Sequence, residues 1–156
     1  MFRLTILCSL IVFLVGYAYP QDSHINLVLF IDGDLVKSGI YDSYFIIDNN
    51  DTISFKYEIG DILVRDSNFQ KLQLLPLGTD ILINFRYRLG GDLSVFAYSI
   101  KLKKEFLFQR FLLLRLYNYA NKENSKFFEN KSGYGFEVES PLGIYKLPQK
   151  RPQKGG

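Results

Sequence analysis

The stretch Asp80–Arg88, with the sequence DILINFRYR, has a residue pattern with a period of two. Its odd-numbered positions are Ile81, Ile83, Phe85 and Tyr87, while most of its even-numbered positions are polar. This period is typical of a β-strand that buries one face. The segment Thr52–Ile59, TISFKYEI, repeats the pattern with apolar residues at its odd-numbered positions. Both segments are therefore expected to be strands.

Three more segments are predicted as strands. Ile25–Ile31 is a nearly continuous apolar run, which suits a strand covered on both faces. Phe136 and Val138 alternate with glutamates. Glu105–Ala120 is rich in leucine, but its polar residues would leave no clear stripe around a helix, so we expect one long or bulged strand. The polar stretch after it, residues 121–133, predicts a mobile loop.

Turn-forming residues predict two hairpins and their registers. The pair Asn49-Asn50 tolerates the positive φ of a two-residue turn, which would place Ile46 opposite Ile53 and Tyr44 opposite Phe55. The apolar faces of the two strands would then coincide.

The second hairpin is expected at Gly90-Gly91-Asp92. A three-residue loop there places Phe85 opposite Ala97 and Arg86 opposite Phe96. Phe96 would then share an outward face with Arg86, and so would Tyr98.

Strands separated by Gly, Asn, Asp and Pro turns predict an all-β fold. We expect a single-domain antiparallel β-sandwich of about eight strands, immunoglobulin-like or transthyretin-like in its general architecture. The alternative is a lipocalin-like barrel whose Phe and Tyr side chains line a cavity for an apolar small molecule.

The N-terminus has the pattern of an export signal. Arg3 precedes the apolar run Leu4–Val15, and Gly16-Tyr17-Ala18 offers a small-x-small cleavage site. We expect residues 1–18 to be a signal peptide, residues 19–147 the β-sandwich domain, and residues 148–156 a disordered basic tail. The protein would then be periplasmic, at the cell surface or secreted, with no transmembrane segment left after cleavage.

Cleavage of that signal would remove the one cysteine of the chain, Cys8. Small exported domains often depend on disulfides, so this domain must instead depend on apolar burial and backbone pairing.

Charge is distributed unevenly along the chain. Residues 19–80 contain 10 acidic and 4 basic side chains, and residues 81–156 contain 6 acidic and 14 basic ones. Because β topologies mix distant segments, we expect strands of the two halves to interleave and their charges to neutralise one another.

The residue types restrict the available chemistry. The chain has one histidine, His24, and no motif for a nucleophile or a zinc site, so we expect no cofactor and no metal. Asp32-Gly33-Asp34 and Asp48–Asp51 contain calcium-type ligands, but they are more typical of turns. Carboxylates are the remaining catalytic resource, which leaves a carboxylate-dependent hydrolase as a weaker alternative.

The sequence therefore predicts an exported, non-catalytic protein with a binding or structural role in the cell envelope or the extracellular space. A protein or glycan is the expected partner, and nucleic acid is not. The candidate partner-binding residues combine positive charge with aromatic rings: Arg86, Arg88, Phe96, Tyr98, Lys101 and Lys103.

Overall fold

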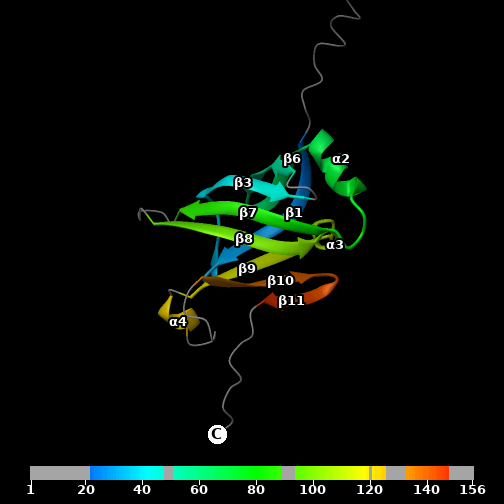
Figure 1. Ribbon diagram of the computed structural model, residues 1–156. Coiled ribbons are helices and arrows are strands. Elements are labelled where there is room, and N and C mark those ends of the chain that lie inside the picture. Colours follow the sequence, from blue (N-terminus) through cyan, green and yellow to red (C-terminus); the bar gives the residue numbers. More distant parts are fainter. Residues whose placement is uncertain (1–21, 48–50, 89–93, 120, 126–132, 148–156) are drawn as a thin grey trace, which may run out of the picture.

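Two β-sheets pack face to face (Figure 1), and the buried apolar side chains form one cluster with them. In this computed structural model the described residues are 22–47, 51–88, 94–119, 121–125 and 133–147. These described residues are mostly β, with 61% in strands and 15% in helices, and their two sheets do not close into a barrel. The prediction of a sandwich-like β fold is confirmed at that level, and the prediction of a lipocalin-like barrel is wrong. The expected signal peptide and basic tail lie outside the described residues.

The strands of each sheet come from distant parts of the chain. Sheet A has the order β11 (Gly143–Leu147), β10 (Tyr134–Ser140), β9 (Leu112–Asn118), β1 (Asp22–Ile31), β6 (Gly60–Arg65) and β5 (Lys56–Glu58), and the short β2 (Asp34–Leu35) pairs with the end of β1. Sheet B has the order β4 (Thr52–Ser54), β3 (Ile40–Ile46), β7 (Asp80–Arg88) and β8 (Val95–Lys103). Each sheet combines strands of the acidic and the basic half, as expected.

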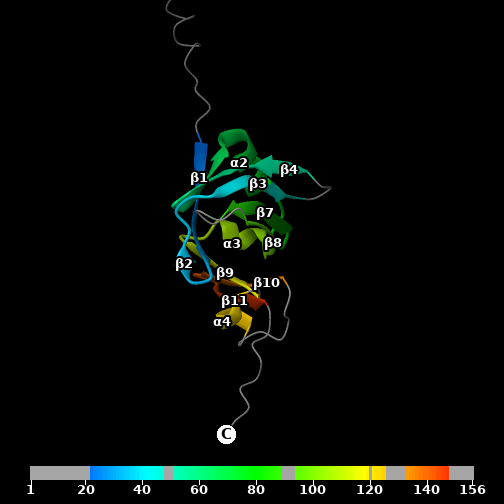
Figure 2. The same cartoon turned by 90° about the vertical axis from the view of Figure 1, so that its left-hand side faces the viewer.

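Within the described ranges three helices connect these strands: α2 (Asp66–Leu74), α3 (Lys104–Leu107) and α4 (Lys122–Ser125). In both views α2 and α4 lie at opposite sides of the molecule (Figure 1, Figure 2). The sequence pattern missed α2 because only Leu72 of this helix is buried, so it shows no apolar stripe.

β1 and β9 run parallel, with Leu27 beside Leu112 and Ile31 beside Leu116. A purely antiparallel sandwich is therefore wrong. The chain leaves sheet B at the end of β8 and passes through α3 before it enters β9 beside the C-terminal half of β1. Parallel neighbouring strands cannot be joined by a tight hairpin turn. The chain between β1 and β9 is long enough to bring β9 in beside β1 in the same direction.

Thr52–Ile59 is two strands rather than one. β4 belongs to sheet B and β5 to sheet A, and the chain passes from one sheet to the other at Phe55. Two hydrogen bonds fix this corner, because the Phe55 N–H donates to Ser43 O (3.1 Å) and the Ser43 hydroxyl donates to Phe55 O (2.5 Å). Ile59, expected on the buried face, is 57% exposed as a result.

Both hairpins exist, but both predicted registers are wrong by one residue. In β3–β4, Phe45 lies opposite Ile53 and the Ile47 N–H donates to Asp51 O (2.9 Å). This register faces Phe45 and Ile53, both fully buried, toward the core and leaves Tyr44 on the outward side. The Asn49-Asn50 turn itself lies outside the described residues.

In β7–β8, Phe85 lies opposite Tyr98 and Arg86 opposite Ala97. The Tyr98 ring packs against Phe85 with 5.3 Å between ring centroids. Burial of this aromatic pair favours the observed register over the predicted one, which would have exposed Tyr98. The loop predicted at residues 90–92 lies outside the described part of the chain.

The segment Glu105–Ala120 is not one strand. Its first residues complete the short helix α3, and the strand β9 begins only at Leu112. The expected apolar face of β9 is confirmed, because Leu112, Leu114 and Leu116 are all buried. β1 buries Ile25, Leu27, Leu29 and Ile31 on one face, whereas the other face is only partly covered.

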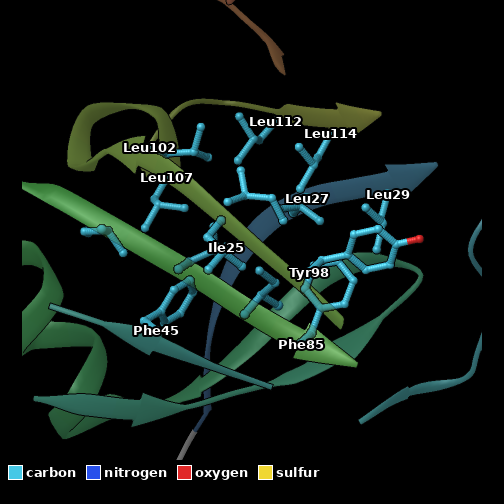
Figure 3. Packing of buried hydrophobic residues seen from close by; sticks show 14 of the residues in the cluster. Ile25, Leu27, Leu29, Phe45, Phe85, Tyr98, Leu102, Leu107, Leu112 and Leu114 are labelled. Carbon is cyan, nitrogen blue, oxygen red and sulfur yellow. The ribbon is translucent and has the colours of Figure 1, made fainter. Parts of the chain in front are cut away.

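The space between the sheets is filled. Side chains of β1 and β9 meet side chains of sheet B, among them Phe45 and Phe85, and Leu107 of α3 lies at the end of the cluster (Figure 3). The cavity among Leu27, Ile83 and their neighbours measures only about 10 Å³. An apolar small molecule has no room in it.

Lys104 is a buried lysine that holds the C-terminal end of α2. It is 8% exposed, and its ammonium donates to the carbonyl oxygens of Gln73 and Leu75. The last carbonyls of a helix lack partners within the helix, so a cation placed there satisfies them. The Lys104 ammonium also lies 5.9 Å from the centre of the Phe108 ring.

Replacing Lys104 with methionine should lower the free energy of unfolding by about 1–3 kcal/mol, because two carbonyls lose their donor. Urea denaturation would measure this loss. Lys101→Met is the matched control, since Lys101 is exposed and should change stability by no more than about 0.5 kcal/mol. Equal losses in the two variants would contradict the role assigned to Lys104.

Candidate ligand-binding site on the outer face of sheet B

The six candidate partner-binding residues do not share one face. Arg86, Arg88, Lys101 and Lys103 lie exposed on the outer face of β7 and β8. Phe96 and Tyr98 point the other way, into the sandwich, and Tyr98 is only 3% exposed. The one-residue error in the predicted register explains this result, because it exchanges the two faces of β8.

Acidic neighbours neutralise much of the predicted cationic surface. The ammonium groups of Lys101 and Lys103 each lie 2.6 Å from a carboxylate oxygen of Asp80. Their hydrogen bonds, first that of Lys101, hold the pKa of the Asp80 carboxyl below its usual value. A general acid needs a raised pKa, so this shift does not suit Asp80 to that role.

The two arginines differ in their surroundings. The Arg86 guanidinium lies 3.3 Å from the Asp42 carboxylate, and both side chains are more than half exposed. The Arg88 guanidinium lies 5.7 Å from the centre of the Tyr41 ring, and within the described chain it forms no ion pair.

A shallow basin of about 780 Å³ occupies the middle of this outer face. The strand registers place Ser54, Tyr44, Asn84 and Ser99 in one row across β4, β3, β7 and β8. Ala97 lies beside Arg86 in the next row. Because serine and alanine side chains are short, the sheet surface is hollow between the larger Tyr44 and Arg86.

Asp42 borders the basin in an unusual backbone conformation. Its φ is +48°, in the left-handed region, and the register of β3 against β7 shifts between Tyr41 and Tyr44. Asp is one of the few residues other than Gly that enter this region. The bulge brings the Asp42 carboxylate beside Arg86, so a donor group and an acceptor group lie together at the rim.

Tyr134 of sheet A closes the basin at its β8 side. Its hydroxyl accepts the Ser99 N–H (2.6 Å) and donates to Ser99 O (2.7 Å). Both sheets therefore contribute to the basin, and the outer edge of β8 is occupied at its centre. Capping of an edge strand in this way hinders pairing with another strand.

The basin offers hydroxyl, amide, guanidinium and carboxylate groups within one open hollow. Such a set can exchange many hydrogen bonds with a polar ligand, and the Tyr44 ring adds a flat apolar surface. Within the part of the chain that the structure describes, no three His, Cys, Asp or Glu side chains gather as a metal site would require.

Two of the other acidic candidates, Asp32 and Asp51, have structural partners. Asp32 has a φ of +53° and accepts hydrogen bonds from the Asn118 backbone N–H (2.7 Å) and from the Asn118 and Asn124 side chains. Its oxygens thus tie the turn after β1 to β9 and α4. Asp51 pairs with Lys71 at 2.6 Å. Exposed His24 lies 3.6 Å from Asp61.

Sequence reasoning missed Asp42, Tyr44, Asn84 and Tyr134 as basin residues. Asn84 occupies one of the polar even-numbered positions of Asp80–Arg88, but the bulge at Asp42 and the contact of Tyr134 across the sheets have no local sequence signal. Of the predicted residues, Arg86 alone has its side chain in the basin, while Tyr98 contributes to the lining from the buried side.

Comparison with protein-family models, with curated proteins and with solved structures found no match. Among the described residues, no helix combines the length and the apolar character needed to cross a membrane.

The buried Tyr98 predicts a loss of stability in alkali. Burial raises the pKa of its hydroxyl above the usual value near 10, and the hydroxyl donates a hydrogen bond to Asn118 Oδ1 (2.7 Å). Since unfolding frees the hydroxyl to ionise at its usual pKa, the stabilisation is complete below about pH 10 and is lost as the pH rises above it. Burial also raises the pKa of Tyr57 in the same sense.

Urea denaturation between about pH 8 and pH 11 measures this effect. The free energy of unfolding should fall above about pH 10, and the fall should be smaller in Tyr98→Phe. That variant starts about 1 kcal/mol less stable because it loses the hydrogen bond to Asn118. An equal alkaline fall in both proteins would show that Tyr98 is not its source.

Proposed function

We propose that this protein is an exported, non-catalytic β-sandwich that binds a glycan of the cell envelope or the extracellular space in the basin on the outer face of sheet B. The observation that carries the proposal is the basin itself, an open polar hollow of about 780 Å³. Ligand sites of proteins commonly have volumes of about 300–1,000 Å³. Export, the absence of catalysis and an immunoglobulin-like or transthyretin-like arrangement of the sheets are parts of the proposal.

The filled interior supports an external site. The cavity between the sheets among Leu27, Ile83 and their neighbours measures only about 10 Å³, which is too small for a ligand. A ligand would then bind on the outer surface, where the identity of the side chains can change without disturbing the packing of the core.

The chemistry of the basin favours a ligand with many hydroxyl groups. The Asp42 carboxylate accepts hydrogen bonds and the adjacent Arg86 guanidinium donates them, so the pair matches neighbouring hydroxyls of a sugar. The opposite charges of this pair also favour a neutral ligand over a strongly charged one. Tyr44 can support a sugar ring as Trp does in many sugar-binding clefts, and the chain contains no Trp.

The backbone at Asp42 is a further sign of a ligand site. A non-glycine residue at positive φ costs free energy, and such residues cluster at binding sites, where their side chains must point in an unusual direction. At Asp42 this backbone conformation directs the carboxylate to the rim of the basin.

Titration calorimetry of the full chain against a panel of neutral oligosaccharides tests the proposal. Asp42→Asn keeps a residue that tolerates positive φ, and Arg86→Gln keeps a hydrogen-bonding side chain. Each should raise the Kd by about 10–100-fold, the usual effect of losing a charged hydrogen-bonding group. Arg88→Gln, two residues along the same strand but outside the basin, is the matched control and should change the Kd less than about threefold.

Two results would contradict the proposal. One is the absence of binding to any neutral or acidic oligosaccharide, with a protein ligand found instead. The other is an equal loss of affinity in Arg88→Gln and Arg86→Gln. Release of shorter sugars from a bound oligosaccharide, followed by chromatography, would show that the protein is an enzyme.

A further inference from the structure

We propose that the basin binds a straight oligosaccharide that lies across the strands of sheet B and fills the basin with about three or four sugar units. This inference rests on the glycan-binding proposal and specifies the ligand, a linear chain rather than a single sugar or a curved chain. Three features of the basin support it: its outline, the spacing of its polar side chains and the position of the Asp42–Arg86 pair.

The basin crosses the four described strands of sheet B. One residue of each strand lies in a single row on its floor: Ser54, Tyr44, Asn84 and Ser99. Neighbouring strands lie about 4.8 Å apart, so the row spans about 14 Å from its first residue to its last. Since β3, β7 and β8 lie side by side in Figure 1, the long direction of the basin runs across them.

The basin is short in the direction of the strands. On β7 it reaches only from Asn84 to Arg86, and on β8 only from Ala97 to Ser99. Two residues of a strand advance the chain by about 7 Å, so the basin is about twice as long across the strands as along them. An elongated outline of this kind fits a chain of sugars better than a single sugar.

The side chains of the row repeat at the spacing of the strands, about 4.8 Å. A pyranose ring with its glycosidic linkage advances a straight glycan by about the same length, so each sugar unit can face one strand. In an extended peptide the side chains on one face repeat about every 6.6 Å, which does not match the row. The spacing therefore favours a glycan over a peptide.

Polar groups along the row are available to a ligand. Among the described residues, none forms a hydrogen bond with the side-chain hydroxyl of Ser54 or of Ser99. The Asn84 amide donates one N–H to Leu82 O (3.3 Å), and its side-chain oxygen remains as an acceptor. The Tyr134 hydroxyl differs, because it already accepts and donates a hydrogen bond at Ser99, so Tyr134 serves as a wall.

The Asp42–Arg86 pair lies to one side of the row. Asp42 is two residues from Tyr44 and Arg86 is two residues from Asn84, so the pair flanks the middle of the row. Hydroxyls on one edge of the middle sugar units can donate to the carboxylate and accept from the guanidinium, and such charge-assisted hydrogen bonds are the stronger ones. The outer units then gain the weaker contacts at Ser54 and Ser99.

Titration calorimetry of the full chain with cello-oligosaccharides and chito-oligosaccharides of increasing length tests the inference. In a series that binds, each added unit should lower the Kd by about fivefold, the effect of one net hydrogen bond. The Kd should stop falling after about three or four units, when the row is filled.

Malto-oligosaccharides are the matched control ligands. They consist of glucose, as cello-oligosaccharides do, but their linkage curves the chain. At equal length they should bind at least about tenfold more weakly than the straight series that binds, because a curved chain cannot contact both ends of the row.

Ser54→Tyr shortens the row, because a large ring then occupies its β4 end. The Kd for a tetrasaccharide of the straight series should rise by at least about fivefold. The Kd for the disaccharide should change less than about twofold, because two units fit beside Arg86 without reaching β4. Thr52→Tyr is the matched control, since Thr52 is exposed on the same face of β4 but lies outside the basin. It should leave the Kd unchanged at every length.

Three results would overturn the straight-chain ligand and leave the glycan-binding proposal standing. They are equal Kd values for a monosaccharide and for longer chains, tighter binding of the malto series, and an equal effect of Ser54→Tyr on the disaccharide and the tetrasaccharide. Binding of neither straight series would overturn it as well. Binding of no oligosaccharide of any kind would remove the glycan-binding proposal with it.

Discussion

The rest of the structure depends on the close packing of two sheets around β1. This strand contributes Ile25, Leu27 and Leu29 to the interface and has β9 on one side and β6 on the other (Figure 3). Because the described part of the chain contains no cysteine, apolar burial and backbone pairing must hold the sheets together. A chain of hydrogen bonds closes one end, from the Tyr98 hydroxyl to Asn118 and from Asn118 to Asp32. The cavity between the sheets measures only about 10 Å³, and the proposed glycan site therefore lies on the outer surface.

The sequence predicted the strand character of the chain because a period of two directly reflects which face a strand buries. Asp80–Arg88 has the predicted limits, and the buried leucines of β9 were identified. Register was harder to predict because it depends on which aromatic side chains pack across the sheets. Tyr98 and Phe45 could each have faced either side until the opposite sheet was known. α2 and the parallel pairing of β1 with β9 depend on tertiary contacts that leave little trace in local sequence.

The same limitation explains why most residues of the candidate site could not be predicted from the sequence. Arg86 was identified from its outward position on an alternating strand, and that position is correct. Its acidic partner Asp42 depends on a bulge, and Tyr134 reaches Ser99 from the other sheet. Residues that come together through a bulge or across sheets cannot be grouped by spacing along the chain. Conversely, Lys104 resembled its exposed neighbours in the sequence, but the end of α2 surrounds it with carbonyl groups.

The central claim is that β8 directs its even-numbered residues into the core and its odd-numbered residues to the basin side. Cysteine accessibility tests it most directly, since replacing Cys8 with serine leaves a chain without thiols. Single cysteines at positions 97 and 99 should react with a thiol reagent at nearly the rate of an unfolded chain, and cysteines at positions 100 and 102 should be strongly protected. Protection at position 97 together with rapid reaction at position 100 would contradict the account.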